Sequence, residues 1–304
     1  MQSCIIGSGT PDSRYIASPE FLATVSYLAT FMEFPILTYG AYCITFKTPN
    51  KMGSVKWLMF NLHFWSSLSD LVISCIGIPF ILLPAPAGYG LGFVDAPRLM
   101  TYCMATLLAA IAASVLALYE NRFFILFDQK SRWMAIRKPF LLFIFTIVPL
   151  VFLPPVFNTP DQETSLQIVL RQIPCQSPDT YKNRKIHVLL LDMSIPLVCI
   201  AIATTILAIP TITFCALIFY NLTMLKKRIN SEKAMEAHKK FAKALTIQSA
   251  FLSSVVLAPV LVIRWIMVTH HHDQALNNFV FITLSLHGVG STIMMIYIST
   301  QAIL

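Results

Sequence analysis

The sequence predicts an all-α membrane protein, a bundle of seven transmembrane helices whose amino terminus lies outside. Seven apolar stretches recur along the chain, most of them about 20 residues or longer, the length that crosses the hydrocarbon core of a bilayer. Hydrophobic residues make up 56% of the chain and charged residues only 12%, a composition typical of a chain surrounded by lipid. The apolar runs lack the alternating pattern of barrel strands, so each is predicted to be a helix.

The predicted spans belong to a single domain that covers residues 1–304. Residues 1–20 form a short extracellular segment, which lacks the continuous apolar core of a signal peptide, so the first span is expected to insert by itself. The seven spans are predicted at about 21–46, 57–83, 99–119, 140–157, 188–225, 245–268 and 279–300.

The distribution of basic residues sets the predicted orientation. Fifteen of the 22 lysines and arginines lie in the first, third and fifth loops between spans. Because short loops rich in lysine and arginine stay on the cytoplasmic side, these loops are predicted to be inside and the long loop at 158–187 outside. This topology accounts for the net charge of +8, so nucleic acid is not a predicted partner.

Two acidic residues lie within the first two spans, where an ionised group in lipid is costly and usually functional. Asp70 stands among serines at 66, 67 and 69, a polar cluster that could hold a sodium ion or water and change on activation. The alternative is a protonated carboxyl bonded to a neighbouring helix. Glu33 has either a functional role or the simpler one of capping a bend next to Pro35.

The third span ends with an acid and a base at the predicted inner boundary of the membrane, in the run Glu120-Asn121-Arg122. Glu120 and Arg122 could pair with each other or with the sixth span, forming a charge latch that breaks when a ligand separates the helices. The alternative is a positive-inside anchor beside an incidental acid. The latch hypothesis predicts that signalling depends on Arg122.

The outer loops offer a lid and a cross-link. The loop at 158–187 carries charges of both signs and is predicted to form a lid over the outer mouth of the bundle. A disulfide between Cys103, at the start of the third span, and Cys175, in this loop, would tie the lid to the bundle, unless Cys103 lies a turn too deep. The adjacent histidines at 270–272 define no coordination geometry, and no metal site is predicted.

Depth and polarity select the candidates for ligand contact, in a mostly apolar pocket between the outer halves of the third, fifth, sixth and seventh spans. Asp192 is either a ligand contact or simply hydrated, and Arg264 either pairs with Asp192 or extends to the lipid headgroups. The candidates are Met104, Leu108, Asp192, Arg264 and His287.

The loop between the fifth and sixth spans is basic, and the helical i,i+4 spacing of Glu232, Glu236 and Lys240 predicts that the sixth helix projects into the cytoplasm. This hairpin is the predicted surface for a partner protein. Its basic residues include Lys226, Lys227, Arg228, Lys239, Lys240 and Lys243.

Signatures of common enzyme classes are absent from the sequence. These include the Gly-x-Ser-x-Gly elbow, the His-Glu-x-x-His zinc pair and the phosphate-binding loop. The run Gly288-Val289-Gly290-Ser291 is more typical of closely packed membrane helices than of a serine nucleophile. The protein is therefore not expected to be an enzyme, and no catalytic residue is assigned.

A series of short stretches, in order along nearly the whole chain, resembles nematode serpentine receptors of class H. This family consists of seven-helix chemosensory receptors regarded as G-protein coupled. The stretches include Val55-Lys56-Trp57, Leu62-His63-Phe64-Trp65, Ala87-Gly88-Tyr89, Glu120-Asn121-Arg122, Pro174-Cys175, Lys240-Phe241, Asn277-Asn278 and Ser285-Leu286-His287-Gly288.

The resemblance implies a rhodopsin-like architecture, in which Glu120 and Arg122 correspond to the acid and arginine of the third helix. Asp70 likewise resembles the acid of the second helix. Two features depart from the pattern: no Asn-Pro-x-x-Tyr follows in the seventh span, and the chain stops at Leu304 where class H receptors continue. A degenerate, non-signalling copy is therefore one alternative.

The resulting hypothesis is that the chain is an olfactory receptor. It would bind a small external chemical and activate a heterotrimeric G protein through Arg122 and the basic hairpin. The resemblance implies the plasma membrane of a sensory-neuron cilium as its location. A ligand-gated channel or transporter is the other alternative, although Glu33, Asp70 and His287 are too few to line a polar path.

Overall fold

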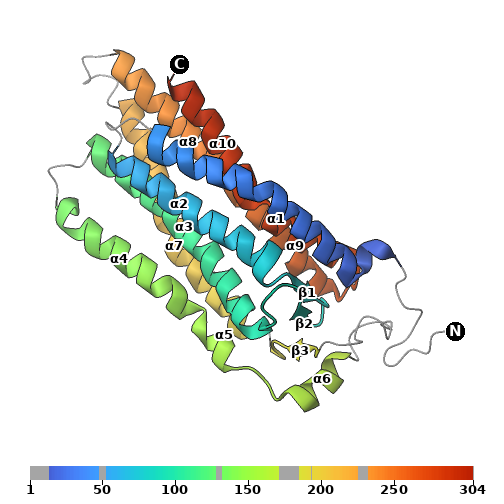
Figure 1. Ribbon diagram of the computed structural model, residues 1–304. Helices are drawn as coiled ribbons and strands as arrows, with labels where there is room; N and C mark the ends of the chain where they lie inside the picture. Colours follow the sequence, from blue (N-terminus) through green and yellow to red (C-terminus); the bar gives the residue numbers. More distant parts are fainter. Residues whose placement is uncertain are drawn as a thin grey trace.

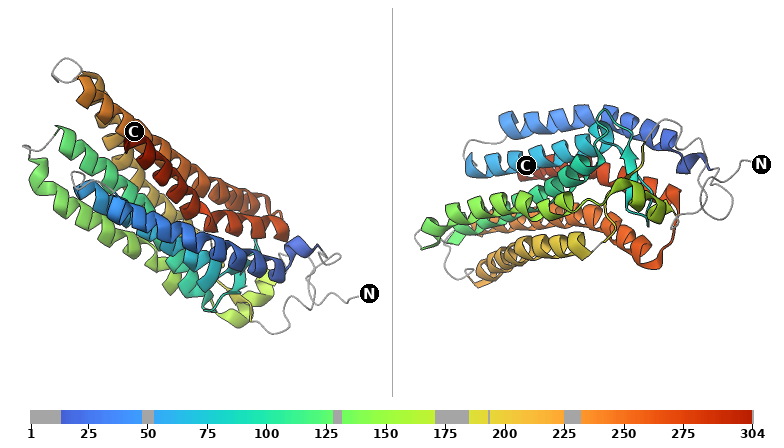
Figure 2. Two further views of the ribbon diagram at one scale, coloured as in Figure 1. Left: turned by 45° about the horizontal axis from the view of Figure 1, so that its top comes forward. Right: turned by 90° about the horizontal axis from the view of Figure 1, so that it is seen from below.

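The computed structural model describes residues 14–47, 53–127, 132–170, 185–192, 194–224 and 232–303. Long helices run side by side along one axis, and a small β-sheet lies at one end of the bundle (Figures 1 and 2). We call this the sheet end. At the opposite end, which we call the basic end, α3 finishes at Phe127 and α4 begins at Trp133. The first long helix begins at the sheet end and the last one ends at the basic end.

The described chain is mostly helical, as predicted. The long helices are α1 (Pro19–Tyr42), α2 (Gly53–Leu71), α3 (Pro97–Phe127), α4 (Trp133–Val151), α7 (Ser194–Met224), α8 (Glu232–Thr269), α9 (Gln274–Ser285) and α10 (His287–Ile303). Shorter helical pieces are η1 (Tyr15–Ala17), η2 (Cys43–Lys47), η4 (Val72–Ile76), α5 (Leu153–Phe157) and α6 (Gln162–Leu170).

Four helical segments of the described chain are long and apolar enough to cross a membrane, and a shorter apolar segment lies in α8. They coincide with the predicted first, third, fourth, fifth and sixth spans. The number of crossings and the orientation of the amino terminus stay predictions. The segments are Pro19–Lys47, Pro97–Ile125, Trp133–Phe157 and Ser194–Asn221, with Ser253–Thr269 as the shorter one.

The start of α1 is set by two residues, Ser18 and Pro19. Ser18 has extended backbone angles and its side chain accepts a hydrogen bond from the Phe21 amide at 3.1 Å, which satisfies one of the free N–H groups of the first turn. Pro19 occupies the first helical position, where its missing N–H costs nothing.

The α8 helix begins at Glu232, well before the predicted 245, in agreement with the expected extension beyond the bilayer.

The predicted second span, 57–83, is wrong at its carboxyl end. The helix finishes at Ile76 with a π-helical turn, and Pro79–Ile81 forms β1 instead. β1 pairs antiparallel with β2 (Ala87–Gly90), which pairs antiparallel with β3 (His187–Val188) from the long loop. The apolar residues Ile78, Phe80 and Leu82 are buried in a cluster at the sheet, together with Leu22 of α1 and Val188 of β3. The start of the predicted fifth span, Val188, likewise belongs to β3.

The predicted seventh span is interrupted at Leu286, between α9 and α10. In a continuous helix the Gly288 N–H would donate to the Leu284 carbonyl. Here the Gly288 N–H donates to the Asp70 carboxylate at 3.2 Å, and the His287 imidazole lies 2.7 Å from the Leu284 carbonyl. The break is therefore caused by side chains that replace one backbone hydrogen bond.

The principal apolar core surrounds α3, which packs against α2, α4 and α7. In Figure 1, α3 runs between α2 and α7. Its middle carries small residues such as Ala109, Ala113 and Ala117, all buried, which allow the neighbouring helices to approach closely. This position makes α3 the helix against which α2, α4 and α7 all pack.

Candidate functional site

A buried pair of titratable side chains, Asp70 and His287, joins α2 to the start of α10. The Nδ1 atom of His287 lies 2.8 Å from Oδ1 of Asp70, and both side chains are fully buried. The same Nδ1 lies 2.7 Å from the Leu284 carbonyl, which can only accept. Nδ1 therefore carries the hydrogen, and the Asp70 carboxylate accepts from it. His287 was predicted as a ligand contact, but the structure places it in the core.

Gly288 allows this close approach. A Cβ atom at this position would lie 2.3 Å from Oδ2 of Asp70 and 3.1 Å from the backbone oxygen of Ser66. Only a residue without a side chain lets α10 lie directly on the Asp70 carboxyl group. The run of small residues at 288–291 therefore serves helix packing, in agreement with the sequence analysis.

Polar groups from α1 extend the cluster around Asp70. The Ser74 hydroxyl donates to the Asp70 backbone carbonyl at 2.8 Å and lies 3.5 Å from Oε2 of Glu33. Thr30 Oγ1 lies 2.8 Å from Ser74 Oγ. Glu33 is 1% exposed and thus faces this cluster from inside the bundle. Several buried oxygens here have no hydrogen-bond partner among the described residues: Oε1 of Glu33, Oδ2 of Asp70, Oγ of Ser66 and Oγ of Ser69.

At the basic end, a buried ion pair joins α3 to α4. The Arg137 guanidinium donates to both oxygens of Glu120, at 3.0 Å and 2.9 Å, in the two-pronged geometry that gives the strongest arginine–carboxylate pairs. The indole N–H of Trp133 also donates to Glu120, at 2.8 Å. Glu120 is 0% exposed, so its charge depends on these donors.

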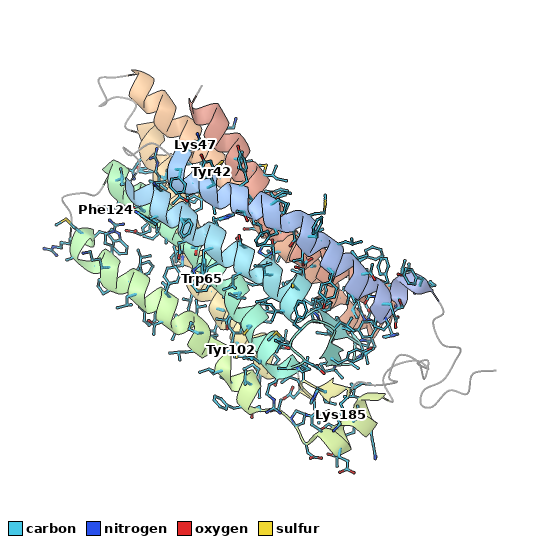
Figure 3. The ribbon with its side chains drawn as sticks, in the orientation of Figure 1. Tyr42, Lys47, Trp65, Tyr102, Phe124 and Lys185 are labelled. Carbon is cyan, nitrogen blue, oxygen red and sulfur yellow. The ribbon has the colours of Figure 1, made fainter. Side chains whose placement is uncertain are left out.

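Asn121 and an aromatic ring complete the surroundings of Arg137. Its Nη2 also donates to the Asn121 side chain at 3.1 Å, and its guanidinium lies 3.9 Å from the centre of the Phe124 ring, over its face. Figure 3 labels Phe124 at this end of the bundle. One arginine of α4 is thus held by three residues of α3, Glu120, Asn121 and Phe124, which fixes how the two helices pack.

The network continues to other helices through aromatic side chains. The Trp133 ring lies 5.6 Å from the Phe214 ring of α7 and 5.5 Å from the Phe140 ring. On the other side of α3, the Tyr119 hydroxyl lies 3.4 Å from the Thr246 hydroxyl of α8. A change at Glu120 can therefore reach α4, α7 and α8 through direct contacts.

These contacts revise the predicted latch. Sequence reasoning expected Glu120 to pair with Arg122 or with the sixth span, whereas the structure pairs it with Arg137. The structure also places Arg122 on α3, where its side chain is buried and only 8% exposed. Arg137 was overlooked because it was counted as one of several positive-inside residues. The signal that would have found it is the i,i+4 spacing of Trp133 and Arg137, which puts both on one helix face.

At the sheet end, buried amides of α9 hold the neighbouring segments in place. Asn278 donates to the backbone carbonyls of Ile16 and Ser18 at 3.0 Å and 3.3 Å, and Asn277 donates to that of Leu83 at 3.2 Å. The start of α1 and the loop after β1 are thus both fixed to α9. Arg14 adds an ion pair with Asp273 at 2.8 Å.

The five predicted ligand contacts lie in different surroundings. Met104 packs on an apolar cluster of α9 residues, and Leu108 packs against the principal core. The Asp192 carboxylate accepts from the Ser194 backbone N–H at 2.8 Å and from its hydroxyl at 2.7 Å, which caps the start of α7 and lowers the Asp192 pKa. Arg264 is exposed, and His287 belongs to the core pair.

Several predicted residues lie outside the part that the structure describes. Cys175 is one of them, so its disulfide with Cys103 stays a prediction. Cys103 itself is partly buried on α3, beside Met100 and Leu107. Of the basic hairpin, Lys243 is exposed. The others fall outside the described residues or side chains: Lys226, Lys227, Arg228, Lys239 and Lys240.

The chain is similar in sequence to known proteins. The sequence profile of the family "Serpentine type 7TM GPCR chemoreceptor Srh" matches residues 17–301. The chain is also similar to "Serpentine receptor class H-72" of Caenorhabditis elegans, with 28% identity over 177 residues. The matched region covers 56% of this chain and 52% of that receptor, so the chain spans about half the length of the relative.

Proposed function

Because the chain belongs to the Srh family of serpentine seven-transmembrane chemoreceptors, a family of receptors and not of enzymes, we propose that it detects a small external chemical and activates a heterotrimeric G protein. The observation that carries this proposal is the buried network of Glu120, Arg137 and Trp133, which ties α3, α4 and α7 together at one end of the bundle. The proposal takes this ion pair as a two-state switch that is closed at rest and separated in the active receptor.

The proposal sets the receptor in the plasma membrane, in a sensory-neuron cilium, with the sheet end outside. The basic end then faces the cytoplasm, where lysine- and arginine-rich loops are retained. In this orientation the α9 amides and the sheet lie on the ligand side, whereas Arg122 and Lys243 lie on the G-protein side. Ligand contact from Met104 and Leu108 also belongs to this proposal.

Direct contacts give the proposed signal a route between the two ends. The α9 helix ends at the break before His287, which binds Asp70 of α2. Within α2, the Trp65 indole donates to the Asn61 side chain at 3.1 Å, and the Asn61 amide donates to Ser114 of α3 at 2.7 Å. A movement of α9 that shifts the α10 junction would therefore act on α2 and then on α3. The two-state element is the pair at Glu120.

Replacing Arg122 with alanine is expected to abolish G-protein activation while the receptor still reaches the cell surface. Arg122 is buried on α3, two residues after Glu120, at the end of the bundle that the proposal assigns to the cytoplasm. The measurement compares ligand-dependent nucleotide exchange and surface labelling for the wild type and R122A. The matched control is Arg132→Ala, which removes an exposed arginine at the start of α4 and should retain activation. Full activation by R122A would remove Arg122 from the switch.

A sodium ion near Asp70 is a further part of the proposal. Sodium, like calcium, is a hard cation that prefers oxygen ligands, and Asp70, Glu33 and Ser69 have buried oxygens without partners among the described residues. We expect the purified receptor to melt at a higher temperature in sodium chloride than in choline chloride at equal ionic strength. The D70N variant should lose this difference. An equal rise in both proteins would show a general salt effect in place of a site.

A further inference from the structure

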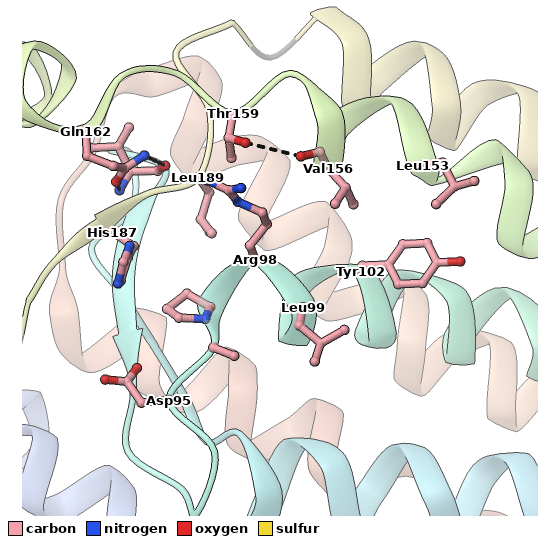
Figure 4. A pocket seen from close by; sticks show the side chains of 13 residues that line it. Asp95, Arg98, Leu99, Tyr102, Leu153, Val156, Thr159, Gln162, His187 and Leu189 are labelled. Atoms are coloured by element: carbon pink, nitrogen blue, oxygen red, sulfur yellow. Dashed lines mark hydrogen bonds between the residues drawn. The ribbon is translucent and has the colours of Figure 1, made fainter.

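A cavity of about 460 Å³ lies at the sheet end, outside the predicted ligand pocket. It is bounded by the start of α3, by α5 and by the segment that carries β3 (Figure 4). This volume falls within the range of pockets that bind small molecules. None of the five residues predicted for ligand contact lines it.

The wall next to β3 is fixed by its own hydrogen bonds. The Gln162 amide donates to the Val188 carbonyl at 3.1 Å, and its oxygen accepts from the Val188 N–H at 2.9 Å. The Thr159 hydroxyl donates to the Val156 carbonyl at 3.2 Å, and the Tyr102 hydroxyl donates to the Pro149 carbonyl at 3.1 Å. These polar side chains already have partners and so have little to offer a ligand.

Two side chains of the lining remain available, and both can donate. Arg98 is exposed and His187 is half-buried, and within the described part of the chain neither side chain makes a hydrogen bond or an ion pair. The carboxyl of Asp95 also lines the cavity, but it accepts from the Gly90 N–H at 3.0 Å. Figure 4 shows Asp95 below His187 and apart from the Arg98 guanidinium. The region around Arg98 therefore favours a negatively charged ligand group.

The rest of the lining is apolar. Leu99, the ring of Tyr102 and Leu153 lie together on one side of the view in Figure 4, whereas His187 and Gln162 lie on the other. Val156 and Leu189 add to the apolar surface. A ligand that satisfies both parts must carry a charged head and an alkyl portion.

We infer that this cavity binds an amphiphilic anion, with a carboxylate or phosphate head on Arg98 and a short alkyl chain over Leu99, Tyr102 and Leu153. Two sources share this chemistry: a dissolved carboxylate from outside, and an anionic phospholipid of the adjacent leaflet. The inference rests on the proposed function only for the expectation that the sheet end faces outside.

The test uses the full chain in phosphatidylcholine nanodiscs and measures binding of octanoate by saturation-transfer NMR, with empty nanodiscs subtracted. Octanoate is expected to bind at least tenfold more tightly than octanol, which has the chain without the charge. Hexanoate is two methylenes shorter and should bind at least about tenfold more weakly than octanoate, since each buried methylene contributes about fourfold in affinity. The variant Arg98→Met should lose the preference for octanoate over octanol.

Lys185→Met serves as the control, because Lys185 is also an exposed cation at the sheet end but does not line the cavity. It should bind octanoate as the wild type does. Equal binding of octanoate by R98M and the wild type, or equal binding of octanol and octanoate, would overturn the inference. Melting temperatures of both variants verify that each is folded.

Nanodiscs that contain phosphatidylglycerol distinguish the two sources. If the phospholipid is the natural occupant, octanoate binding weakens in these discs for the wild type but not for R98M. If a dissolved carboxylate is the occupant, phosphatidylglycerol has no effect. Both outcomes support the anion site. Binding needs no G protein, so a chain that binds octanoate but never activates a G protein would contradict the proposed function and leave the site intact.

Discussion

Replacing Arg137 with methionine is expected to lower the stability of the folded receptor by about 3–5 kcal/mol, the usual cost of leaving a buried charge without its partner. Glu120 is fully buried, and without Arg137 it keeps the Trp133 indole as a side-chain donor. The methionine keeps most of the apolar stem, so the loss reports on the charge and its hydrogen bonds. Thermal unfolding of the purified receptor measures the effect.

The neighbouring residue provides the control. Lys138 is an exposed cation one position further along α4, and Lys138→Met should change the melting temperature little. The double variant E120Q/R137M removes both charges and should recover much of the stability lost in R137M, because no ionised group is then buried alone. If R137M has the same melting temperature as the wild type, the Glu120–Arg137 pair does not hold α3 and α4 together.

Replacing Gly288 with alanine is expected to destabilise the receptor by about 1–3 kcal/mol or more and to reduce its amount at the cell surface. The new methyl group would lie 2.3 Å from Oδ2 of Asp70, so either α10 moves away or the carboxyl group turns and loses His287. Both outcomes disturb a pair that is fully buried. The measurements are the melting temperature and the surface-labelled fraction.

The same substitution two residues further along α10 serves as a control. A Cβ atom at Gly290 would lie 2.8 Å from the Phe251 ring, which is 36% exposed and has room to move. Gly290→Ala should therefore cost less than Gly288→Ala. Equal losses in the two variants would mean that general crowding, and not the Asp70 pair, accounts for the effect.

The sequence predicted those helices that the length and composition of a single apolar run can identify. Apolar length alone identified the helices that match the first, third, fourth and fifth spans, because every backbone group in lipid must be satisfied within its own segment. The strand at Pro79–Ile81 was missed because a short apolar run has the same composition in a buried strand and in a buried helix. Its pairing with β2 depends on contacts that the sequence does not display.

The candidate site shows a similar division. Asp70 and Glu120 could be recognised individually, since each is an acid within or at the end of an apolar stretch. Their partners could not, because His287 and Arg137 approach them only through the packing of other helices. The break at Leu286 has the same origin: it depends on the Asp70 carboxyl of α2 accepting the Gly288 N–H.

The central claim is that this chemoreceptor acts through a G protein and does not conduct ions itself. The most direct test records ligand-evoked responses from cells that carry the receptor at their surface, with and without GDP-β-S in the recording pipette to block G proteins. An amino-terminal tag labelled in intact cells verifies surface expression and tests the predicted orientation. The account predicts that the response disappears when G proteins are blocked. A ligand-evoked current that persists under this block would contradict it and indicate a channel.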